Sequence, residues 1–220
     1  MDVVKTKSQL KHRLDELRKK GTIGFVPTMG ALHPGHISLV EKAASETDFV
    51  VVSIFVNPTQ FNDSNDLNRY PRNLETDLEL LRKTDCQLVF APAAEEVYPE
   101  PDTRKFNFGN LEKIMEDRHR PGHFNGVAQV VSKLFELVNP DNAYFGRKDF
   151  QQLAIIKKLV AQLKLSVKIV PCPIIREENG LAMSSRNELL TPEQRENAGL
   201  IYKTLVQAKN LTAEMTVKEL

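Results

Sequence analysis

Residues 22–36 read TIGFVPTMGALHPGH, and this stretch decides the fold. The apolar run Thr22–Val26, ended by Pro27, predicts a short buried strand, and the glycine- and proline-rich residues 28–35 predict a loop. Apolar spacing in Ile37–Ser45 then predicts a helix. The first amides of a helix are unpaired and carry partial positive charge, so a strand, loop and helix in this order indicate a phosphate site.

The same alternation of strands and helices continues along the chain. Phe49–Val56 is β-branched almost throughout and lacks polar alternation, which is typical of a parallel strand covered on both faces. Strands are also predicted at Leu88–Ala91, Ala143–Phe145 and Val167–Val170, and helices at Ser8–Lys20, Leu74–Arg82, Val127–Leu137 and Gln151–Leu163. The pattern predicts an α/β fold with a Rossmann-like, doubly wound parallel sheet, whose ligands bind at the carboxyl ends of its strands.

The composition argues against several classes of protein. The chain has 220 residues, and its 30 basic and 29 acidic residues give a net charge of +1. With no basic stripe, this balance weighs against a nucleic-acid partner. Two cysteines, Cys86 and Cys172, are too few for a disulfide scaffold and lack the spacing of a metal site. The N-terminus has no apolar signal segment and no run is long enough to cross a membrane, so we expect a cytoplasmic protein.

The loop ends in a histidine pair, His33-Pro34-Gly35-His36. Both imidazoles can face a ligand at the helix N-terminus and donate hydrogen bonds to phosphate oxygens. One alternative is a tight turn in which the two rings cap backbone groups. Another is a zinc pair, although no third ligand lies nearby at a suitable spacing. The order of strand, glycine-rich loop, histidine pair and helix favours nucleotide binding over both.

This histidine pair resembles the His-x-Gly-His signature of the nucleotidylyltransferase superfamily, and residues 182–187 resemble its second, Lys-Met-Ser-Lys-Ser-type signature. A more specific resemblance, to the pantoate–β-alanine ligase family, rests on six motifs that nearly span the chain. They are PTMGALHPGH (27–36), FVNPTQF (55–61), RYPR (69–72), RPGHF (120–124), FGRKDFQQ (145–152) and MSSRN (183–187).

The resemblance implies a reaction and its participants. Members of the family condense pantoate with β-alanine at the expense of ATP, through a pantoyl-adenylate intermediate, and release AMP and pyrophosphate. The implied participants are therefore ATP with Mg²⁺, pantoate and β-alanine, and the implied assembly is a homodimer. Because a carboxylate must approach a triphosphate, the site has to supply positive charge and exclude water.

The resemblance also implies which residues form the site. The catalytic residues would be His33, His36, Lys148 and Arg186, with His36 matching the family's proton donor. The implied ATP-binding residues are Met29, Gly30, Ala31, Leu32, His33, Pro34, Gly35, His36, Gly146, Arg147, Lys148, Asp149, Ile175, Met183, Ser184, Ser185 and Arg186. Arg147 stands where an acid or amide is expected, so its side chain is expected to point outward.

The remaining implied contacts involve the acid and the amine. Gln60 and Gln152 match the pantoate pocket, and Gln60 also matches the β-alanine contact. Asp77 is a candidate magnesium ligand, although a lone helical carboxylate is usually solvated and the ion more often travels on the ATP phosphates. Without the resemblance, Gln60, residues 146–149 and residues 183–187 could each be turns or polar loops, and Arg120–His123 is interpreted as a β-turn.

The resemblance implies two domains. Residues 1–174 would form the Rossmann-like ATP- and pantoate-binding domain, and residues 175–220 would be the start of a small C-terminal α+β lid, truncated relative to the family. Two other functions stay open: a nucleotidyltransferase of the same superfamily, and a non-catalytic module that binds a nucleotide or tRNA. The nucleotidyltransferase does not explain the segments that contain Gln60 and Gln152, and the near-zero net charge weighs against a tRNA-binding module.

Overall fold

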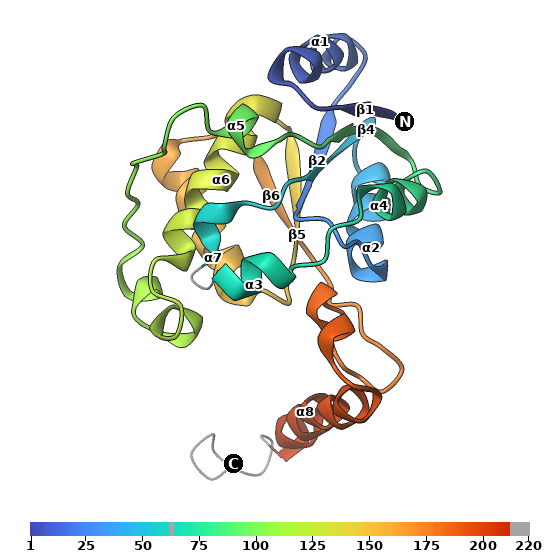
Figure 1. Ribbon diagram of the computed structural model, residues 1–220, viewed down its shortest axis with the longest axis vertical. Helices are drawn as coiled ribbons and strands as arrows, with labels where there is room; N and C mark the ends of the chain where they lie inside the picture. The colour runs from blue at the N-terminus through green and yellow to red at the C-terminus, as the bar shows by residue number, and fades with distance from the viewer. Residues whose placement is uncertain (62–63, 212–220) are drawn as a thin grey trace.

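The computed structural model describes residues 1–61 and 64–211, which form a parallel sheet between two layers of helices and a tail that leads away from it (Figure 1). The sheet has six strands in the order β1-β4-β3-β2-β5-β6, and every neighbouring pair is parallel. The strands are β1 (Asp2–Val4), β2 (Ile23–Thr28), β3 (Phe49–Ile54), β4 (Cys86–Phe90), β5 (Asn142–Gly146) and β6 (Lys168–Cys172). This confirms the predicted doubly wound α/β fold.

Helices cover both faces of the sheet. One layer packs α1, α5, α6 and α7 into the larger hydrophobic cluster, and the other packs α2 and α4 into the smaller cluster. The helices are α1 (Lys7–Arg18), α2 (Pro34–Ala44), α3 (Ser64–Arg69), α4 (Leu74–Leu81), α5 (Ala94–Val97), α6 (His123–Val138), α7 (Phe150–Leu163) and α8 (Pro192–Leu211). Burial on both faces explains why β3 is apolar except for Ser53, because neither face meets water.

One predicted strand end is wrong. The sequence predicts that Pro27 ends its strand, but β2 continues to Thr28. Ile23 exchanges hydrogen bonds with Asp141, just before β5. The backbone polar groups of alternate residues of β2, including Pro27, therefore point towards β5. On β2, pairing with β5 stops at Phe25. Pro27 therefore has no partner in β5, and its missing N–H removes no hydrogen bond from the sheet.

The edge strand β1 has no counterpart among the predicted elements. Asp2–Val4 pairs with Leu88–Phe90 of β4, and of these three β1 residues only Val4 is buried. Three residues are too few to show the periodicity that predicts a strand, and Asp2–Val4 is extended because it pairs with β4. The other predicted strands and helices are confirmed, with bounds that move by a few residues.

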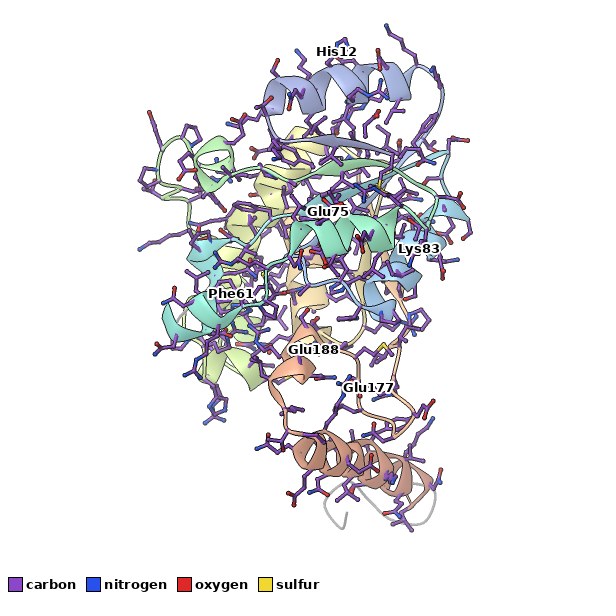
Figure 2. All side chains as sticks on the ribbon, turned by 45° about the vertical axis from the view of Figure 1, so that its right-hand side comes forward. His12, Phe61, Glu75, Lys83, Glu177 and Glu188 are labelled. Atoms are coloured by element: carbon purple, nitrogen blue, oxygen red, sulfur yellow. The ribbon has the colours of Figure 1, made fainter. Side chains whose placement is uncertain are left out.

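The tail begins after β6 with a tight turn. Arg176 and Ala182 form an antiparallel bridge, followed by the 3-10 turn η4 (Ser185–Leu189) and then α8. Thr191 and Gln194 bond reciprocally at the start of α8 and form a capping box. Figure 2 shows Glu177 and Glu188 in the segment between the sheet and α8. No helix in the described ranges has both the length and the apolar character needed to cross a bilayer.

Candidate active site

A cavity of about 420 Å³ opens at the carboxyl ends of β2, β5 and β6, and we call it the crevice. Met29 follows β2, Lys148 follows β5 and Ile175 follows β6, and all three line it. The crevice lies where β2 and β5 meet, at the position in the sheet from which the chain winds outward in both directions. Ligands of open α/β sheets bind at this kind of position.

The loop between β2 and α2 has a fixed backbone. Gly30 and Ala31 adopt the left-handed conformation, with φ of 81° and 49°. The carboxylate of Asp77, on α4, accepts hydrogen bonds from the N–H groups of Ala31 at 3.0 Å and Leu32 at 2.7 Å. Burial raises the pKa of Asp77, and the two backbone hydrogen bonds oppose this rise.

The premise that the backbone amides around the start of α2 are unpaired does not hold for this loop. Every N–H from residue 30 to residue 37 has an acceptor within the protein. The acceptors are Thr28 Oγ1 for Gly30, the Asp77 carboxylate for Ala31 and Leu32, His36 Nδ1 for His33, His33 Nδ1 for Gly35, and the His33 carbonyl for His36 and Ile37. The donors that this loop can offer to a ligand are therefore its side chains.

Two imidazoles supply those donors. His33 Nδ1 accepts from Gly35 N at 3.1 Å, and His36 Nδ1 accepts from His33 N at 3.3 Å. A neutral ring whose Nδ1 accepts carries its proton on Nε2, on the opposite side of the ring. Both rings line the crevice with centroids 4.0 Å apart. The capping and ligand-binding interpretations are thus compatible, because Nδ1 of each ring accepts from the backbone and Nε2 can donate to a ligand.

Both rings are held neutral. Burial lowers the pKa of His33, and the nearby charge of Lys148 lowers it further. Burial lowers the pKa of His36 to about 3, and His33 and Lys148 add to this effect. Within the described ranges, no group of three His, Cys, Asp or Glu residues could hold a metal ion, so the zinc alternative has no third ligand.

Cationic side chains border the crevice on its other sides. Lys148 lines it and forms an ion pair with Asp149 at 3.1 Å. Arg186 lines it from the tail and reaches Asp66 on α3 with both Nε, at 3.2 Å, and Nη2, at 2.8 Å. Arg147 is exposed and does not line the crevice, and its backbone N–H donates to the Cys172 carbonyl.

An amide corner forms at the end of the crevice beside α6. Gln60, in the 3-10 turn η1 (Pro58–Gln60), donates through Nε2 to Met29 Sδ at 2.9 Å. Its Oε1 accepts from Asn57, which also donates to the Gly126 carbonyl. A Cβ on Gly126 would clash with the backbone of Thr59, so a glycine is required for α6 to approach this turn.

Sequence reasoning missed the second support of Gln60. His123 Nδ1 lies 2.8 Å from the Gln60 carbonyl, and its Nε2 lies 3.3 Å from Arg120 Nη1. Because a carbonyl and a guanidinium have fixed roles, His123 donates through Nδ1 and accepts through Nε2. Glu116, Tyr70, Arg120 and His123 all line the crevice. The signal for three of them was available, since they lie in the motifs 69–72 and 120–124.

The adjacent glutamines Gln151 and Gln152 have different surroundings. Gln152 lines the crevice, as the resemblance implies. Gln151 is buried and holds the backbone of the preceding loop, accepting from Glu116 N and donating to the carbonyls of Leu111 and Ile114. The first turn of α7 therefore anchors the preceding loop through the Gln151 amide and presents the Gln152 amide to the crevice.

The signature segment of the tail closes the remaining side. Met183, Ser184, Ser185 and Arg186 line the crevice, and Ile175 lies beside them, its carbonyl accepting from Met183 N. Ser185 Oγ donates to the Ala31 carbonyl at 3.1 Å, so this segment rests directly on the β2–α2 loop. The structure thus brings residues of all six motifs, which are far apart in the sequence, to the crevice.

Comparisons with known proteins agree on one family. The family model described as pantoate–β-alanine ligase matches residues 2–220. Pantothenate synthetases of Phocaeicola vulgatus and Bacteroides fragilis are 58% and 54% identical, and each alignment covers 100% of this chain and 78% of the relative. A pantothenate synthetase crystal structure from Thermus thermophilus superposes with a TM-score of 0.92 at 47% identity, covering 97% of this chain and 76% of that one.

A further structural neighbour was solved with ligands. The pantoate–β-alanine ligase of Francisella tularensis, complexed with an ATP species and β-alanine, superposes with a TM-score of 0.88 at 44% identity. The superposition covers 92% of this chain and 78% of that chain.

Proposed function

The chain belongs to the pantoate–β-alanine ligase family, and from this premise we propose how its crevice joins the two substrates. The reaction is the condensation of pantoate with β-alanine, with ATP as co-substrate. In the proposed course, the pantoate carboxylate attacks the α-phosphorus of ATP and pyrophosphate leaves. The amine of β-alanine then attacks the acyl carbon of pantoyl adenylate, loses a proton and displaces AMP.

One observation carries the proposal: two neutral imidazoles with protonated Nε2 atoms share the crevice with Gln60 and Gln152. We assign the imidazoles of His33 and His36 to the phosphate oxygens, where negative charge builds up as the carboxylate attacks. Preorganised donors of this kind stabilise a transition state without reorganising during the step. Lys148 and Arg186 supply the net positive charge that neutral imidazoles lack.

The acid fits the end of the crevice that holds the amide corner. Gln60 and Gln152 can donate to the pantoate carboxylate and accept from its hydroxyl groups, and Gln60 is also assigned to β-alanine. Val127, Val130 and Val131 of α6 form an apolar wall there, which suits the two methyl groups of pantoate. Ile175 and Met183 are assigned to the nucleotide, together with Ser184 and Ser185.

The residues do not fit a protein-held magnesium ion. Asp77, the candidate ligand, has both carboxylate oxygens engaged by backbone N–H groups and does not line the crevice. No cluster of three acidic, histidine or cysteine side chains occurs in the part of the chain that the structure describes. We propose that Mg²⁺ enters with the ATP phosphates, and no step is assigned to it.

We also propose the two-domain division at residue 175 and a homodimer, both of which the family resemblance implies. The tail after residue 174 contacts the first domain through few side chains, among them Ser185 and Arg186, which is compatible with a lid. Of the predicted lid, residues 212–220 lie outside the described residues. Equilibrium sedimentation tests the dimer.

A product assay tests the reaction. The protein should release pyrophosphate from ATP only when pantoate is present, and AMP rather than ADP should accumulate once β-alanine is added. With hydroxylamine in place of β-alanine, an acyl adenylate gives pantoyl hydroxamate. A stable nucleotide-bearing product without hydroxamate would instead favour a nucleotidyltransferase, and ATP binding without pyrophosphate release would favour a non-catalytic module.

A further inference from the structure

We propose that Asp77 is a positioning residue of this reaction: its carboxylate fixes the Gly30–Ala31 turn and thereby holds the rings of His33 and His36 at the crevice. The inference rests on the donor role proposed for those two rings. It replaces the metal-ligand role that the sequence suggests for Asp77 and gives this buried carboxylate a function that involves no contact with substrate.

The carboxylate is held rigidly. Asp77 is 3% exposed, and it lies on α4, which buries Leu78 and Leu81 in the smaller hydrophobic cluster. Asn73 caps the start of this helix by accepting from Thr76 N. A carboxylate on a capped and packed helix can act as a fixed reference point for the loop that it holds.

The turn that it holds needs support. Ala31 is an L residue in the left-handed region, which costs conformational free energy, and Gly30 before it shares this conformation. Successive N–H groups in such a turn form a concave site that favours an anion. Here the anion is the side chain of Asp77, at 3.0 Å from Ala31 N and 2.7 Å from Leu32 N.

The turn is connected directly to both imidazoles. Leu32 precedes His33, whose N–H donates to the His36 ring and whose own ring accepts from Gly35 N. The carbonyl of Ala31 also accepts from Ser185 Oγ, so the same turn seats the signature segment of the tail. A shift of this turn therefore moves the histidine donors and the contact to the tail together, and small misplacements at a catalytic site have large kinetic effects.

A metal role for Asp77 conflicts with this geometry. A cation at the carboxylate would have to displace the N–H groups of Ala31 and Leu32, which donate at short distances. Asp77 also borders a different cavity from the one that His33 and His36 line. The two roles predict different kinetics, because a ligand change alters the magnesium requirement and a positioning change alters turnover.

The first test is the substitution Asp77→Asn, compared with Glu79→Gln, which changes an exposed carboxylate on the same helix to an amide. The Asn side chain keeps one acceptor but turns an NH₂ group towards a backbone N–H. We expect kcat to fall about 10- to 100-fold, with no change in the Mg²⁺ concentration for half-maximal rate. Glu79→Gln should match the wild type. Wild-type turnover in Asp77→Asn, or recovery of its rate at high Mg²⁺, would overturn the proposal.

The second test measures the protonation and surroundings of the two imidazole rings instead of the activity. In ¹⁵N-histidine NMR spectra of the wild type, His33 and His36 should both carry the proton on Nε2, and Asp77→Asn should shift their signals while leaving His12 on α1 unchanged (Figure 2). Unshifted His33 and His36 signals would refute the positioning role. If these signals shift but the wild type lacks ligase activity, then the proposed function fails and the positioning of the rings stands.

A measurement on the wild type covers the case in which Asp77→Asn does not fold. Mn²⁺ added without nucleotide should leave the amide signals of Ala31 and Leu32 sharp. Selective broadening of those two signals would show that a cation reaches Asp77, and it would overturn the proposal.

Discussion

The β2–α2 loop and the tail segment 183–189 meet across the crevice, yet they are built on opposite principles. In the loop, every backbone N–H from residue 30 to residue 37 has an acceptor within the protein, and the two imidazoles are held neutral. The tail segment is held by side chains: Ser185 donates to Ala31, and Arg186, whose side chain is 42% exposed, pairs with Asp66 on α3.

This difference indicates a division of labour. The loop offers directional donors whose positions are set during folding, so they need no reorganisation when charge develops on a phosphate. The tail offers a full charge on a long side chain whose present partner, Asp66, can be exchanged for a phosphate. Fixed neutral donors and a cation carried by the proposed lid together suit the proposed reaction, in which two anions must meet.

The largest effect should come from removing a fixed donor. His36→Gln keeps an acceptor that can cap His33 N but removes the imidazole. We expect pantoate-dependent pyrophosphate release to fall about 10²- to 10³-fold, or roughly 3–4 kcal/mol in transition-state free energy. The matched control is His12→Gln on α1, whose histidine is 76% exposed. Comparable turnover in the two variants would remove His36 from the mechanism.

A smaller effect should appear in stability as the pH falls. The pKa of His36 is lowered to about 3 and that of His33 is also lowered, so below pH 6.5 the unfolded chain binds more protons than the folded one. Stability is therefore fully present above pH 6.5 and declines as the pH drops towards 3. Between pH 7 and 5.5 we expect His36 to account for a loss of about 1 kcal/mol in the free energy of unfolding.

Urea denaturation at the two pH values measures this loss. His36→Gln should reduce the difference between them, whereas His12→Gln should leave it intact. An equal pH dependence in wild type and His36→Gln would contradict the assignment of a neutral, buried ring.

The smallest effect should come from the tail segment, through the ion pair of Arg186 with Asp66. Asp66→Asn removes the anion that holds Arg186, so less free energy is needed to transfer the guanidinium to a phosphate. Because the pair is partly exposed, at 42% and 32%, we expect a change of about 0.5 kcal/mol, seen as a roughly two-fold lower KM for ATP with kcat unchanged. Asp15→Asn, at an exposed position on α1, is the control. A higher KM for ATP would mean that Asp66 supports binding rather than competing with it.

Much of the fold could be predicted from the sequence because buried segments have a recognisable local pattern of apolar residues. Phe49–Ile54 is apolar except for Ser53, since both of its faces are covered, and the Thr191–Gln194 capping box is complete within four residues. Pro27 shows the limit of such reasoning. A proline ends a strand when its N–H is needed, and only the neighbouring strand determines whether that is so.

Candidate site residues were also accessible from the sequence, but their tasks were not. The histidine pair, Gln60 and Gln152 all line the crevice, as the family motifs imply. Sequence patterns suggested a magnesium role for Asp77 and a structural turn for His123. The structure joins Asp77 to residues 46 and 45 positions earlier and His123 to a carbonyl 63 positions earlier.

By itself, the sequence determined the chemistry available to this protein: a sheet with helices on both faces, a paired imidazole after the first long strand, amides and cations in motifs further on. The tertiary structure decided which of those groups a ligand can meet. Hydrogen bonds between distant segments engaged the backbone of the loop and left the ring nitrogens as its donors. That outcome depends on which acceptors folding brings within 3 Å or so, and residue order along the chain does not encode those distances.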